Sequence, residues 1–314
     1  MSLRRAAFAI PGDLSTPTGG YKYERSLLEA LRAQGRDVAY LKLGPSFPDA
    51  TPADMADAVA QLAGLAPDRV AILDGFVSAT LDTDALAALQ VPRVAMVHHP
   101  LALETGLSPE RRDHLYRLER ANLAHVDHVL VPSPATASVL SAQYGVAPGR
   151  ITVAPPGTER PLLPRAPVSP PLILSVGIQH PRKGHDILLR ALARLTDLDW
   201  HAVIAGKVLD AAHAADLERL RAELGLADRV RLAGHVPDAE LAGLYARATL
   251  FALATRYEGY GLVFDEALAN GLPIVSCHVG AVPDTVPVGA GRLVAPDDAA
   301  ALAVGEQRAR EVQA

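Results

Sequence analysis

Short apolar runs of strand length alternate with helical patterns along most of this 314-residue chain. This alternation favours parallel strands joined by helices, because each crossover brings the chain back to the same edge of a sheet. Strands are expected in the first half at residues 6–10, 37–43, 69–75, 93–99, 127–133 and 150–156. Strands are expected in the second half at residues 172–176, 201–205, 230–233, 250–254, 274–277 and 292–294. The expected fold class is α/β, with Rossmann-like halves.

A proline-rich segment separates the two halves. Residues 155–171 read PPGTERPLLPRAPVSPP, and proline neither donates to a sheet ladder nor continues a helix. We expect a linker over residues 157–170, between an N-terminal domain over 1–156 and a C-terminal domain over 171–314. Two α/β domains joined in this way create a cleft, which is a favoured place for a ligand.

Charge and cysteine usage exclude several classes of protein. The formal net charge is −5, which argues against a general nucleic-acid surface, since that needs clustered excess lysine and arginine. Cys277 is the single cysteine, so no intrachain disulfide can form and a reducing compartment fits. No apolar run reaches the ~18 residues of a membrane-spanning helix, and the first apolar run is too short for a signal peptide. These features predict a soluble, cytoplasmic protein.

The stretch 256–273, RYEGYGLVFDEALANGLP, carries the strongest candidate site. Strand, glycine-bearing turn and helix are expected in succession here, and that arrangement points backbone N–H groups at an anion. Glu258, before the helix, can accept hydrogen bonds from sugar hydroxyls, and Glu266, inside it, can accept both hydroxyls of a ribose. Taken alone, the two glutamates are explained more simply as a helix-start carboxylate and a solvated helix residue.

Other candidates follow expected strands, at the carboxyl ends where α/β proteins bind ligands. Gly19 and Gly20 open a helix after the first strand, and a tight turn would explain them equally well. His98 directly follows the apolar run 94–97, although lone histidines are more often structural. His99 is an alternative, and neighbours on a strand point to opposite faces, so the two histidines should not share one metal ion.

A pair of cations, Arg182 and Lys183, lies between the strand glycine Gly177 and the next expected helix. Such cations can neutralise the two phosphates of a leaving nucleotide diphosphate. A solvated pair at a helix start is the simpler alternative. That alternative is weakened because cations are disfavoured at helix N-termini unless an anion is present.

Two further patterns favour structural explanations. The Asp-x-Asp strings 82–84 and 197–199 resemble Mg²⁺ ligands, but the first lies at an expected helix start and the second in a turn. We therefore predict no required metal. The segment 109–120 contains four arginines that could contact an anionic membrane or acceptor lipid, yet three acidic residues interleave with them and favour a mixed, solvated face.

Taken together, Glu258-Gly-Tyr-Gly, the run 266–269 and the run 271–275 closely resemble the donor-site motif of the family 4 retaining glycosyltransferases. The resemblance covers most of the chain and is strongest over 172–286. It implies the GT-B architecture, two Rossmann-like domains with parallel sheets facing across a cleft. It also implies a hexosyltransferase-like enzyme that moves a sugar from a nucleotide-diphosphate sugar with retention, without cofactor or metal.

The resemblance assigns residues to roles. The catalytic residues that it implies are His98, Arg182, Lys183 and Glu258. The donor-binding residues that it implies are Gly19, Gly20, Gly177, Arg182, Lys183, Val236, Glu258, Gly259, Tyr260, Gly261, Leu262 and Glu266. Many members carry an arginine directly after the strand glycine, where this chain has Ile178, so the phosphate-binding arginine is assigned to Arg182. The loop around Val236 would contact the base through its backbone, which leaves the base open.

Partners and alternatives are less constrained. The acceptor, on the N-terminal domain, can be a glycan, a lipid-linked molecule or a small molecule, as in polysaccharide biosynthesis. A nucleotide-sugar epimerase of GT-B fold and an inactive nucleotide-sugar-binding protein are alternatives. We expect a helix from Asp297 and Asp298 towards Val312, and no final helix crossing back to the first domain. That predicts loose coupling of the domains and self-association, with peripheral membrane contact as a further partner interaction.

Overall fold

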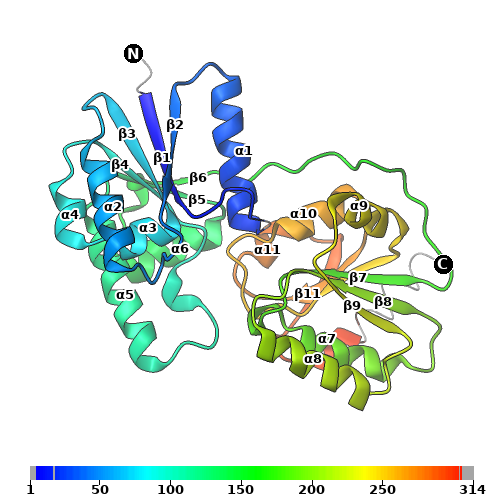
Figure 1. Ribbon diagram of the computed structural model, residues 1–314. Helices are drawn as coiled ribbons and strands as arrows, with labels where there is room; N and C mark the ends of the chain where they lie inside the picture. The colour runs from blue at the N-terminus through cyan, green and yellow to red at the C-terminus, as the bar shows by residue number, and fades with distance from the viewer. Residues whose placement is uncertain (1–4, 17, 304, 306–314) are drawn as a thin grey trace. The chain divides into compact units, whose positions relative to one another are not determined.

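The computed structural model describes residues 5–16, 18–303 and 305 (Figure 1). The chain divides into two compact units, Met1–Gly157 and Thr158–Ala314. Residues 158–170 contain no helix or strand. Among the described residues, no helix combines the length and the apolar character needed to cross a membrane.

Unit 1 is built on a six-stranded parallel sheet in the order β2-β1-β3-β4-β5-β6. Its strands are β1 (Arg5–Pro11), β2 (Val38–Leu43), β3 (Arg69–Asp74), β4 (Arg93–Met96), β5 (His128–Val131) and β6 (Ile151–Val153). Its helices are α1 (Gly19–Ala33), α2 (Pro52–Ala63), α3 (Gly75–Thr80), α4 (Thr83–Ala88), α5 (Pro109–Ala124) and α6 (Pro134–Tyr144).

The helices of unit 1 begin where the sequence supplies caps. Thr51, Ser108 and Ser133 each accept a backbone N–H in the first turn of α2, α5 and α6, and a proline follows each of them. This pairing is favourable because the side chain satisfies an unpaired donor while proline lacks a donor at the next position. The alternating strand residues then divide between two faces. Phe8 packs with Leu28 of α1, whereas Ala9 faces the residues of α2 to α6.

Unit 2 contains a second six-stranded parallel sheet in the order β12-β11-β10-β7-β8-β9. Its strands are β7 (Leu172–Val176), β8 (His201–Ala205), β9 (Val230–Gly234), β10 (Leu250–Leu253), β11 (Ile274–Cys277) and β12 (Gly291–Val294). Its helices are α7 (His185–Leu192), α8 (Ala211–Glu223), α9 (Asp238–Arg247), α10 (Leu262–Ala269) and α11 (Val282–Thr285), with a 3-10 turn at Pro181–Lys183.

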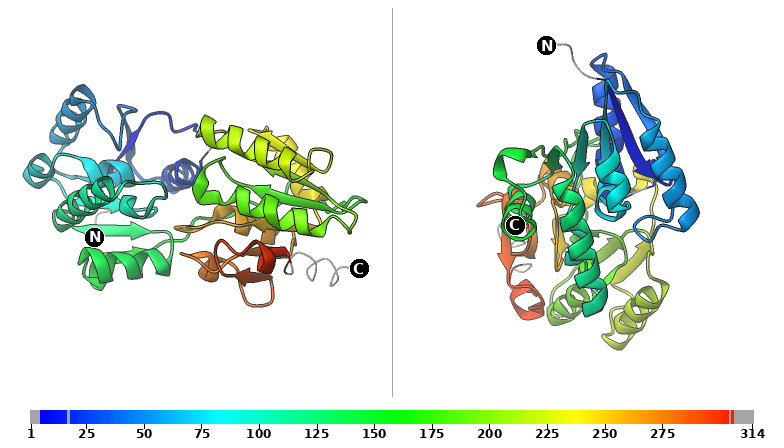
Figure 2. Two further views of the ribbon diagram at one scale, coloured as in Figure 1. Left: turned by 90° about the horizontal axis from the view of Figure 1, so that it is seen from below. Right: turned by 90° about the vertical axis from the view of Figure 1, so that its left-hand side faces the viewer.

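Helices cover both faces of the second sheet, as the views of Figures 1 and 2 show. On one face, Ile173 packs among residues of α7 and α8. On the other, Leu172 and Leu174 pack with residues of α9, α10 and α11. Burying a large side chain such as Phe264, which is fully inside, stabilises the fold by roughly 1.5–3 kcal/mol.

Each sheet has a point at which the strand order reverses. In unit 1 the chain runs from β1 outward to β2 and then returns to β3 on the other side of β1. In unit 2 it runs from β7 through β8 to β9 and returns to β10 on the other side of β7. Ligands of open α/β sheets bind outside the carboxyl ends of the strands at such a point. The fold therefore directs attention to the loops after β1 and β3 and after β7 and β10.

The expected strands are all present, and the expected α/β class with two parallel sheets is confirmed. Several boundaries were wrong: β4 ends at Met96 rather than continuing through His99, β5 ends at Val131 rather than at residue 133, and β6 ends at Val153 rather than at residue 156. Met96 pairs with Asp74, where β3 ends, so no neighbouring strand continues alongside His98. Asp298 accepts the backbone N–H of Ala301 as a cap. The helix expected towards Val312 lies outside the described residues beyond 303, except for 305.

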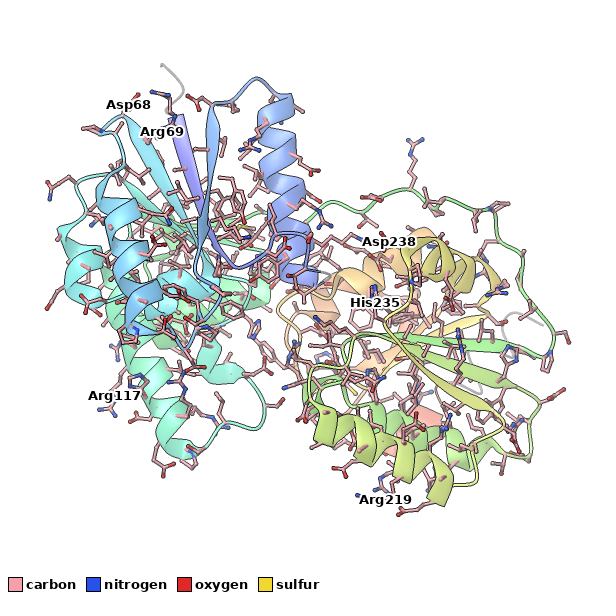
Figure 3. All side chains as sticks on the ribbon, in the orientation of Figure 1. Asp68, Arg69, Arg117, Arg219, His235 and Asp238 are labelled. Atoms are coloured by element: carbon pink, nitrogen blue, oxygen red, sulfur yellow. The ribbon has the colours of Figure 1, made fainter. Side chains whose placement is uncertain are left out.

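The arginine-rich segment forms α5 with a mixed surface, as expected. Arg117 pairs with Asp113 one turn earlier, and its side chain is 73% exposed (Figure 3). Arg111 pairs with Asp49, which also neutralises its charge.

Asp82 caps α4 by accepting the N–H of Ala85, so this aspartate has the structural role that its position predicted.

Candidate functional site

A buried ion cluster occupies the switch point of unit 2. The Nζ atom of Lys183, in the turn after β7, lies 2.5 Å from Oε1 of Glu258, which follows β10. Arg182 Nη1 lies 3.7 Å from the other oxygen, Oε2. Thr255 adds a hydroxyl 2.9 Å from Glu258 Oε1. Two cations and one carboxylate meet here, at the carboxyl edge of the sheet.

Glycines allow these two loops to approach each other. Gly184, which follows Lys183, has φ +62°, and a Cβ atom there would lie 2.0 Å from the carbonyl oxygen of Ala254. Gly177 directly follows β7 and packs against the aliphatic part of Lys183. A Cβ atom at Gly177 would lie 3.2 Å from Cδ of the lysine. Side chains at either glycine would push the lysine or its loop away from Glu258. The glycines thus fix where the ammonium group can lie.

Opposing effects set the ionisation of Glu258. Burial would raise the pKa of this carboxyl, since only 5% of the residue is exposed. The charges of Lys183 and Arg182, with hydrogen bonds from Lys183 and Thr255, outweigh burial and hold the pKa below its ordinary value. Glu258 is therefore a carboxylate at neutral pH. Removing Glu258 would leave the charges of Lys183 and Arg182 buried without a counter-charge.

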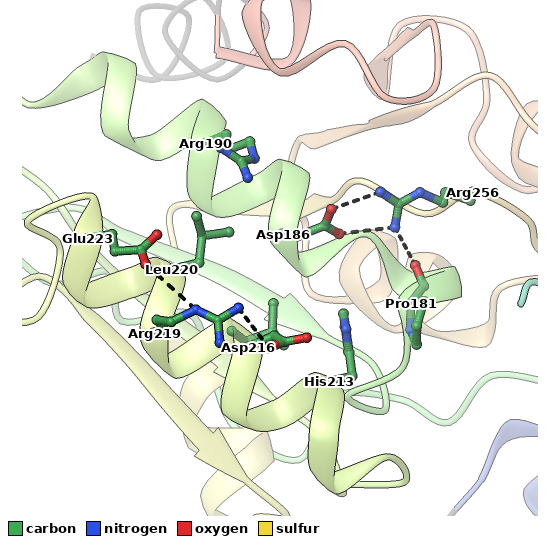
Figure 4. Close-up of a pocket in the computed structure, with 10 residues that line it drawn as sticks. Pro181, Asp186, Arg190, His213, Asp216, Arg219, Leu220, Glu223 and Arg256 are labelled. Atoms are coloured by element: carbon green, nitrogen blue, oxygen red, sulfur yellow. Dashed lines mark hydrogen bonds and ion pairs between the residues drawn. The ribbon is translucent and has the colours of Figure 1, made fainter.

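Arg256 connects the loops after β7 and β10, and we call its set of bonds the Arg256 clamp. Its backbone N–H donates to the carbonyl of Arg182 at 2.8 Å, and its Nη1 donates to the carbonyl of Pro181 at 2.5 Å. Its guanidinium also forms a bidentate pair with Asp186 in the first turn of α7, at 2.9 and 3.0 Å (Figure 4). Its Nε donates to Asp297 at 2.7 Å.

A polar cavity of about 440 Å³ lies next to the Arg256 clamp, between α7 and α8. Arg219 lines the cavity on the α8 side, where it pairs with Asp216 and Glu223, and His213 also lines it (Figure 4). Its charges are largely paired within its own walls. The cavity contains none of the predicted site residues, so we do not assign the donor site to it.

The second glutamate of the motif and the loop before α10 are held by hydroxyl groups. Glu266 lies on α10 and accepts a hydrogen bond from the Tyr245 hydroxyl at 2.9 Å. Tyr260 is held by its own hydroxyl, which lies 2.5 Å from Asp265, and by its carbonyl, which accepts from Thr285. Gly261 has φ +92° and is the cap residue directly before α10. Gly259 belongs to this loop, and Leu262 is the first residue of the helix.

Two side chains of the loop after β9 differ in their exposure. Val236 is 8% exposed and packs in the core with residues of α9 and β10, whereas His235 is exposed (Figure 3). Only backbone groups of Val236 can therefore reach a ligand, as the predicted base contact requires. Asp238 is the first residue of α9 rather than its cap, since Pro237 occupies the cap position.

A second cluster occupies the switch point of unit 1. His98 Nε2 lies 3.1 Å from Oε1 of Glu24 and 3.9 Å from Oδ2 of Asp74. Glu24 is on α1, Asp74 ends β3, and His98 follows β4. Gly20 places α1 against the ring, because a Cβ atom there would lie 3.4 Å from Cδ2 of His98. His99 contacts Glu104 instead, so the two histidines do diverge.

The carboxyl groups of this second cluster are perturbed. Burial raises the pKa of Glu24 to about 7, against a hydrogen bond with Asp74 that lowers it. Burial and the charge of Glu24 raise the pKa of Asp74 well above its ordinary value. Burial lowers the pKa of His98, and the charge of Asp74 opposes that shift. The side-chain ligand atoms of these three residues lie within 4.8 Å of one another, but nothing in the structure assigns a metal to them.

The structure thus brings the sequence-predicted residues together in two groups, one in each unit. Gly177, Arg182, Lys183 and Glu258 meet in unit 2, while Gly20 and His98 meet in unit 1. Sequence reasoning missed Thr255, Asp74, Arg256 and Glu24. Thr255 and Asp74 carried a usable signal, because each is a polar residue at the end of a buried strand. Glu24 carried none, since it lies inside a helix.

Family comparisons agree with this division. The family model Glycosyltransferase Family 4 matches residues 23–160, and the model Glycosyl transferases group 1 matches residues 164–308. The chain therefore belongs to the glycosyltransferases that these two models describe, as the motif at 258–275 predicted.

Curated relatives share this assignment over part of their length. An MMP alpha-(1->4)-mannosyltransferase of Mycolicibacterium hassiacum is 33% identical over 229 residues, which cover 68% of this chain and 55% of the relative. A D-inositol 3-phosphate glycosyltransferase of Catenulispora acidiphila is 34% identical over 205 residues, covering 59% of this chain and 49% of the relative. The chain thus spans about half the length of the curated relatives that it matches.

Solved structures agree in fold. Sucrose-phosphate synthase from Thermosynechococcus elongatus superposes with a TM-score of 0.83 at 24% identity, covering 98% of this chain and 89% of that one. HepE of Anabaena, solved in complex with UDP-glucose, gives a TM-score of 0.75 at 20% identity, with 99% and 91% coverage. At these identities the likeness establishes the GT-B fold class alone.

Proposed function

We propose that this protein is a retaining glycosyltransferase that moves a hexose from a nucleotide-diphosphate sugar to a hydroxyl acceptor. One observation carries the proposal: Arg182 and Lys183 converge with Glu258 at the switch point of unit 2. The two cations lie where an open α/β sheet binds ligands. Glu266 lies eight residues further on, within α10, next to the Tyr245 hydroxyl.

The proposed chemistry follows from charge. When the glycosidic bond to the donor breaks, negative charge grows on the departing nucleotide diphosphate. Arg182 and Lys183 stabilise that charge without having to move far, because Glu258 and the clamp of Arg256 already hold them. Glu258 presents its carboxylate to hydroxyls of the transferred sugar. Glu266 accepts hydrogen bonds from the ribose.

In unit 1 we assign His98 to contact with the transferred sugar and Gly19-Gly20 to the diphosphate, as the family resemblance implies. Neither assignment invokes a metal or another cofactor, and retention at the anomeric carbon is inherited from the resemblance alone. The names of the relatives support mannose as the first sugar to test. They support phosphorylated polyols, such as D-inositol 3-phosphate, as the first acceptors.

The test is a matrix of donors and acceptors with the purified chain. Uridine, guanosine and adenosine diphosphate sugars are each incubated with D-inositol 3-phosphate, hexose phosphates and short mannosides, in the presence of EDTA. We expect one donor to give a glycoside of the same anomeric configuration, read by NMR. A product of inverted configuration would overturn retention, and no transfer with any acceptor would overturn the activity.

A control omits the acceptor. If the donor's sugar then changes its stereochemistry, the protein is an epimerase rather than a transferase. If the nucleotide sugar binds but nothing turns over in any combination, the fold acts only as a binding protein for nucleotide sugars. Thermal stabilisation by each nucleotide sugar identifies the donor independently of turnover, because a ligand that binds only the native state raises the melting temperature.

A further inference from the structure

We propose that Glu24 and Asp74 are positioning residues that hold the His98 ring with its Nε2–H turned inward, so that Nδ1 is presented as a hydrogen-bond acceptor to a sugar hydroxyl. This inference rests on the proposed function for the identity of the ligand. The orientation and protonation of the ring can be tested without it. Neither carboxylate belongs to a motif that the sequence revealed.

The geometry defines which ring nitrogen is occupied. Nε2 is 3.1 Å from Oε1 of Glu24, within hydrogen-bonding distance, and Asp74 Oδ2 stands behind it at 3.9 Å. A carboxylate accepts but does not donate, so the proton of a neutral ring lies on Nε2. The other oxygen of Asp74, Oδ1, accepts the N–H of Phe76 at 2.8 Å as the cap of α3. Asp74 is thereby fixed in its own orientation.

The two carboxyl groups require a shared proton. Glu24 is fully buried and Asp74 is 4% exposed, and Oε2 of Glu24 has no hydrogen-bond partner among the described residues. Two adjacent buried carboxylates cannot both be charged at low cost, so one proton stays with the pair. We place that proton on Asp74, because the contact between the two groups raises the pKa of Asp74 and lowers that of Glu24. Glu24 then remains the carboxylate that accepts from Nε2. The raised pKa values of both groups agree with this. The pair then carries one negative charge, enough to orient the ring's N–H dipole.

Packing leaves the opposite edge of the ring available. Positions for a Cβ atom at Gly20 and Gly75 lie 3.4 and 3.8 Å from Cδ2 of His98, so these two backbones cover the Cδ2–Nε2 edge. The His98 side chain nevertheless keeps 23% of its surface exposed. We place that exposed surface at the opposite edge of the ring, which carries Nδ1. A neutral imidazole whose Nε2 donates has an acceptor lone pair at Nδ1.

The tyrosines near the ring are neutral at neutral pH. Tyr23 meets it edge-on at 5.9 Å between ring centroids, and its hydroxyl is bound to the carbonyl of Ala154. Burial raises the pKa values of Tyr21 and Tyr23, so both stay neutral at neutral pH. Asp13 is exposed, and its hydrogen bonds to Ser15 lower its pKa.

Nitrogen-15 NMR of the full chain provides the test. In EDTA at neutral pH, we expect a downfield proton resonance attached to Nε2 of His98, with Nδ1 unprotonated. Glu24→Met should remove that resonance, because methionine has a similar length and no acceptor oxygen. Glu29→Met on the same helix is the matched control, because Glu29 is exposed, and the resonance should persist. A proton on Nδ1, or a resonance unchanged in Glu24→Met, would overturn the proposal.

Two additions keep the outcome decisive. If Glu24→Met does not fold, Glu24→Gln replaces it, and the resonance should move upfield, since a neutral acceptor makes a weaker hydrogen bond. An unmoved resonance again contradicts the proposal. Stoichiometric Zn²⁺ should leave the wild-type spectrum unchanged. Loss of the Nε2 proton on adding Zn²⁺ would show a metal site in its place.

The functional readout separates the two levels of inference. By titration calorimetry, Glu24→Met should weaken binding of the nucleotide sugar about tenfold while leaving the sugarless nucleoside diphosphate unaffected. If wild-type protein binds neither ligand, the proposed function fails, and the NMR experiment still decides the state of His98. If both ligands weaken equally, Glu24 acts on the fold rather than through the histidine, and the proposal fails.

Discussion

At the scale of single residues, the pairing of Lys183 with Glu258 decides how the candidate site works. Both side chains are almost fully buried, and they contact each other at 2.5 Å. A buried pair of this kind adds little net stability, because desolvating two charges costs about what their attraction returns. Under the proposed function, the pair holds a cation ready for an incoming diphosphate.

We predict that Lys183→Ala lowers turnover more than it weakens donor binding. The ammonium group stabilises charge that grows as the bond breaks, so its loss should cost about 2–4 kcal/mol of barrier, or roughly 30- to 900-fold in kcat. Steady-state kinetics and calorimetry measure the two effects. Lys42→Ala, an exposed lysine on β2, is the matched control. Wild-type turnover in Lys183→Ala would refute the assigned role.

Glu258→Gln and Glu266→Gln should differ in character. Glutamine at 258 keeps a carbonyl oxygen for Lys183 and Thr255, so we expect sugarless nucleoside diphosphate to bind normally and only the sugar nucleotide to weaken. Glu266→Gln should weaken both ligands about tenfold, because one ribose contact loses its charge. Calorimetry with both ligands distinguishes the two. Equal weakening of the sugarless ligand by both variants would contradict the division of roles.

At the scale of elements, the loops after β7 and β10 form one structure because Arg256 bonds to both. It reaches the carbonyls of Pro181 and Arg182 and the carboxylate of Asp186 at the start of α7. Interactions between a cation and buried backbone carbonyls are stronger than exposed ion pairs, since water competes less for them. The position of Arg182 and Lys183 therefore depends on a residue outside the cluster.

Arg256→Met should raise KM for the donor about tenfold and lower the melting temperature of unit 2 by a few degrees. Arg219→Met is the control, because Arg219 also pairs with two carboxylates and lines the same cavity but its side chain forms no hydrogen bond with the backbone of the described residues. Its exposed pairs predict little change in either quantity. The same change in KM for both variants would show that loss of surface charge, rather than the clamp, is responsible.

At the scale of the whole molecule, buried acids should make stability depend on pH. Burial raises the pKa of Glu119 on α5 to about 8, despite a hydrogen bond from the Leu101 N–H. A carboxyl with a raised pKa binds its proton more tightly in the native state than in the unfolded chain. Its stabilising contribution is complete below its ordinary pKa near 4.5 and disappears as pH rises through about 8.

We therefore predict that the melting temperature of the wild-type protein falls between pH 5 and pH 9, and that Glu119→Gln reduces this fall by on the order of 5 °C. Glu24 contributes a remaining slope, because its pKa is raised to about 7 in the same sense. Calorimetric scans across the pH range measure the effect. Glu29→Gln should reproduce the wild-type curve, and an identical curve for Glu119→Gln would contradict the prediction.

The sequence by itself determined the fold class, the order of strands and helices, and the donor motif. These follow from local periodicity, from caps such as Ser133 before Pro134, and from glycines that only particular turns require. Each of these signals is confined to a few neighbouring positions. They also showed which side chains follow strands, as with His98 and Lys183.

Only the tertiary structure decided which of those side chains meet. Lys183 and Glu258 are 75 residues apart, and Glu24 and His98 are 74 apart, so no local pattern relates them. The order of the strands brings β7 next to β10 and β1 next to β3, and each pair of loops then meets at one edge. Burial at those edges raises the pKa values of Glu24 and Asp74, whereas Lys183 and Arg182 lower that of Glu258 against the effect of burial. Both effects depend on all the groups packed around a carboxyl.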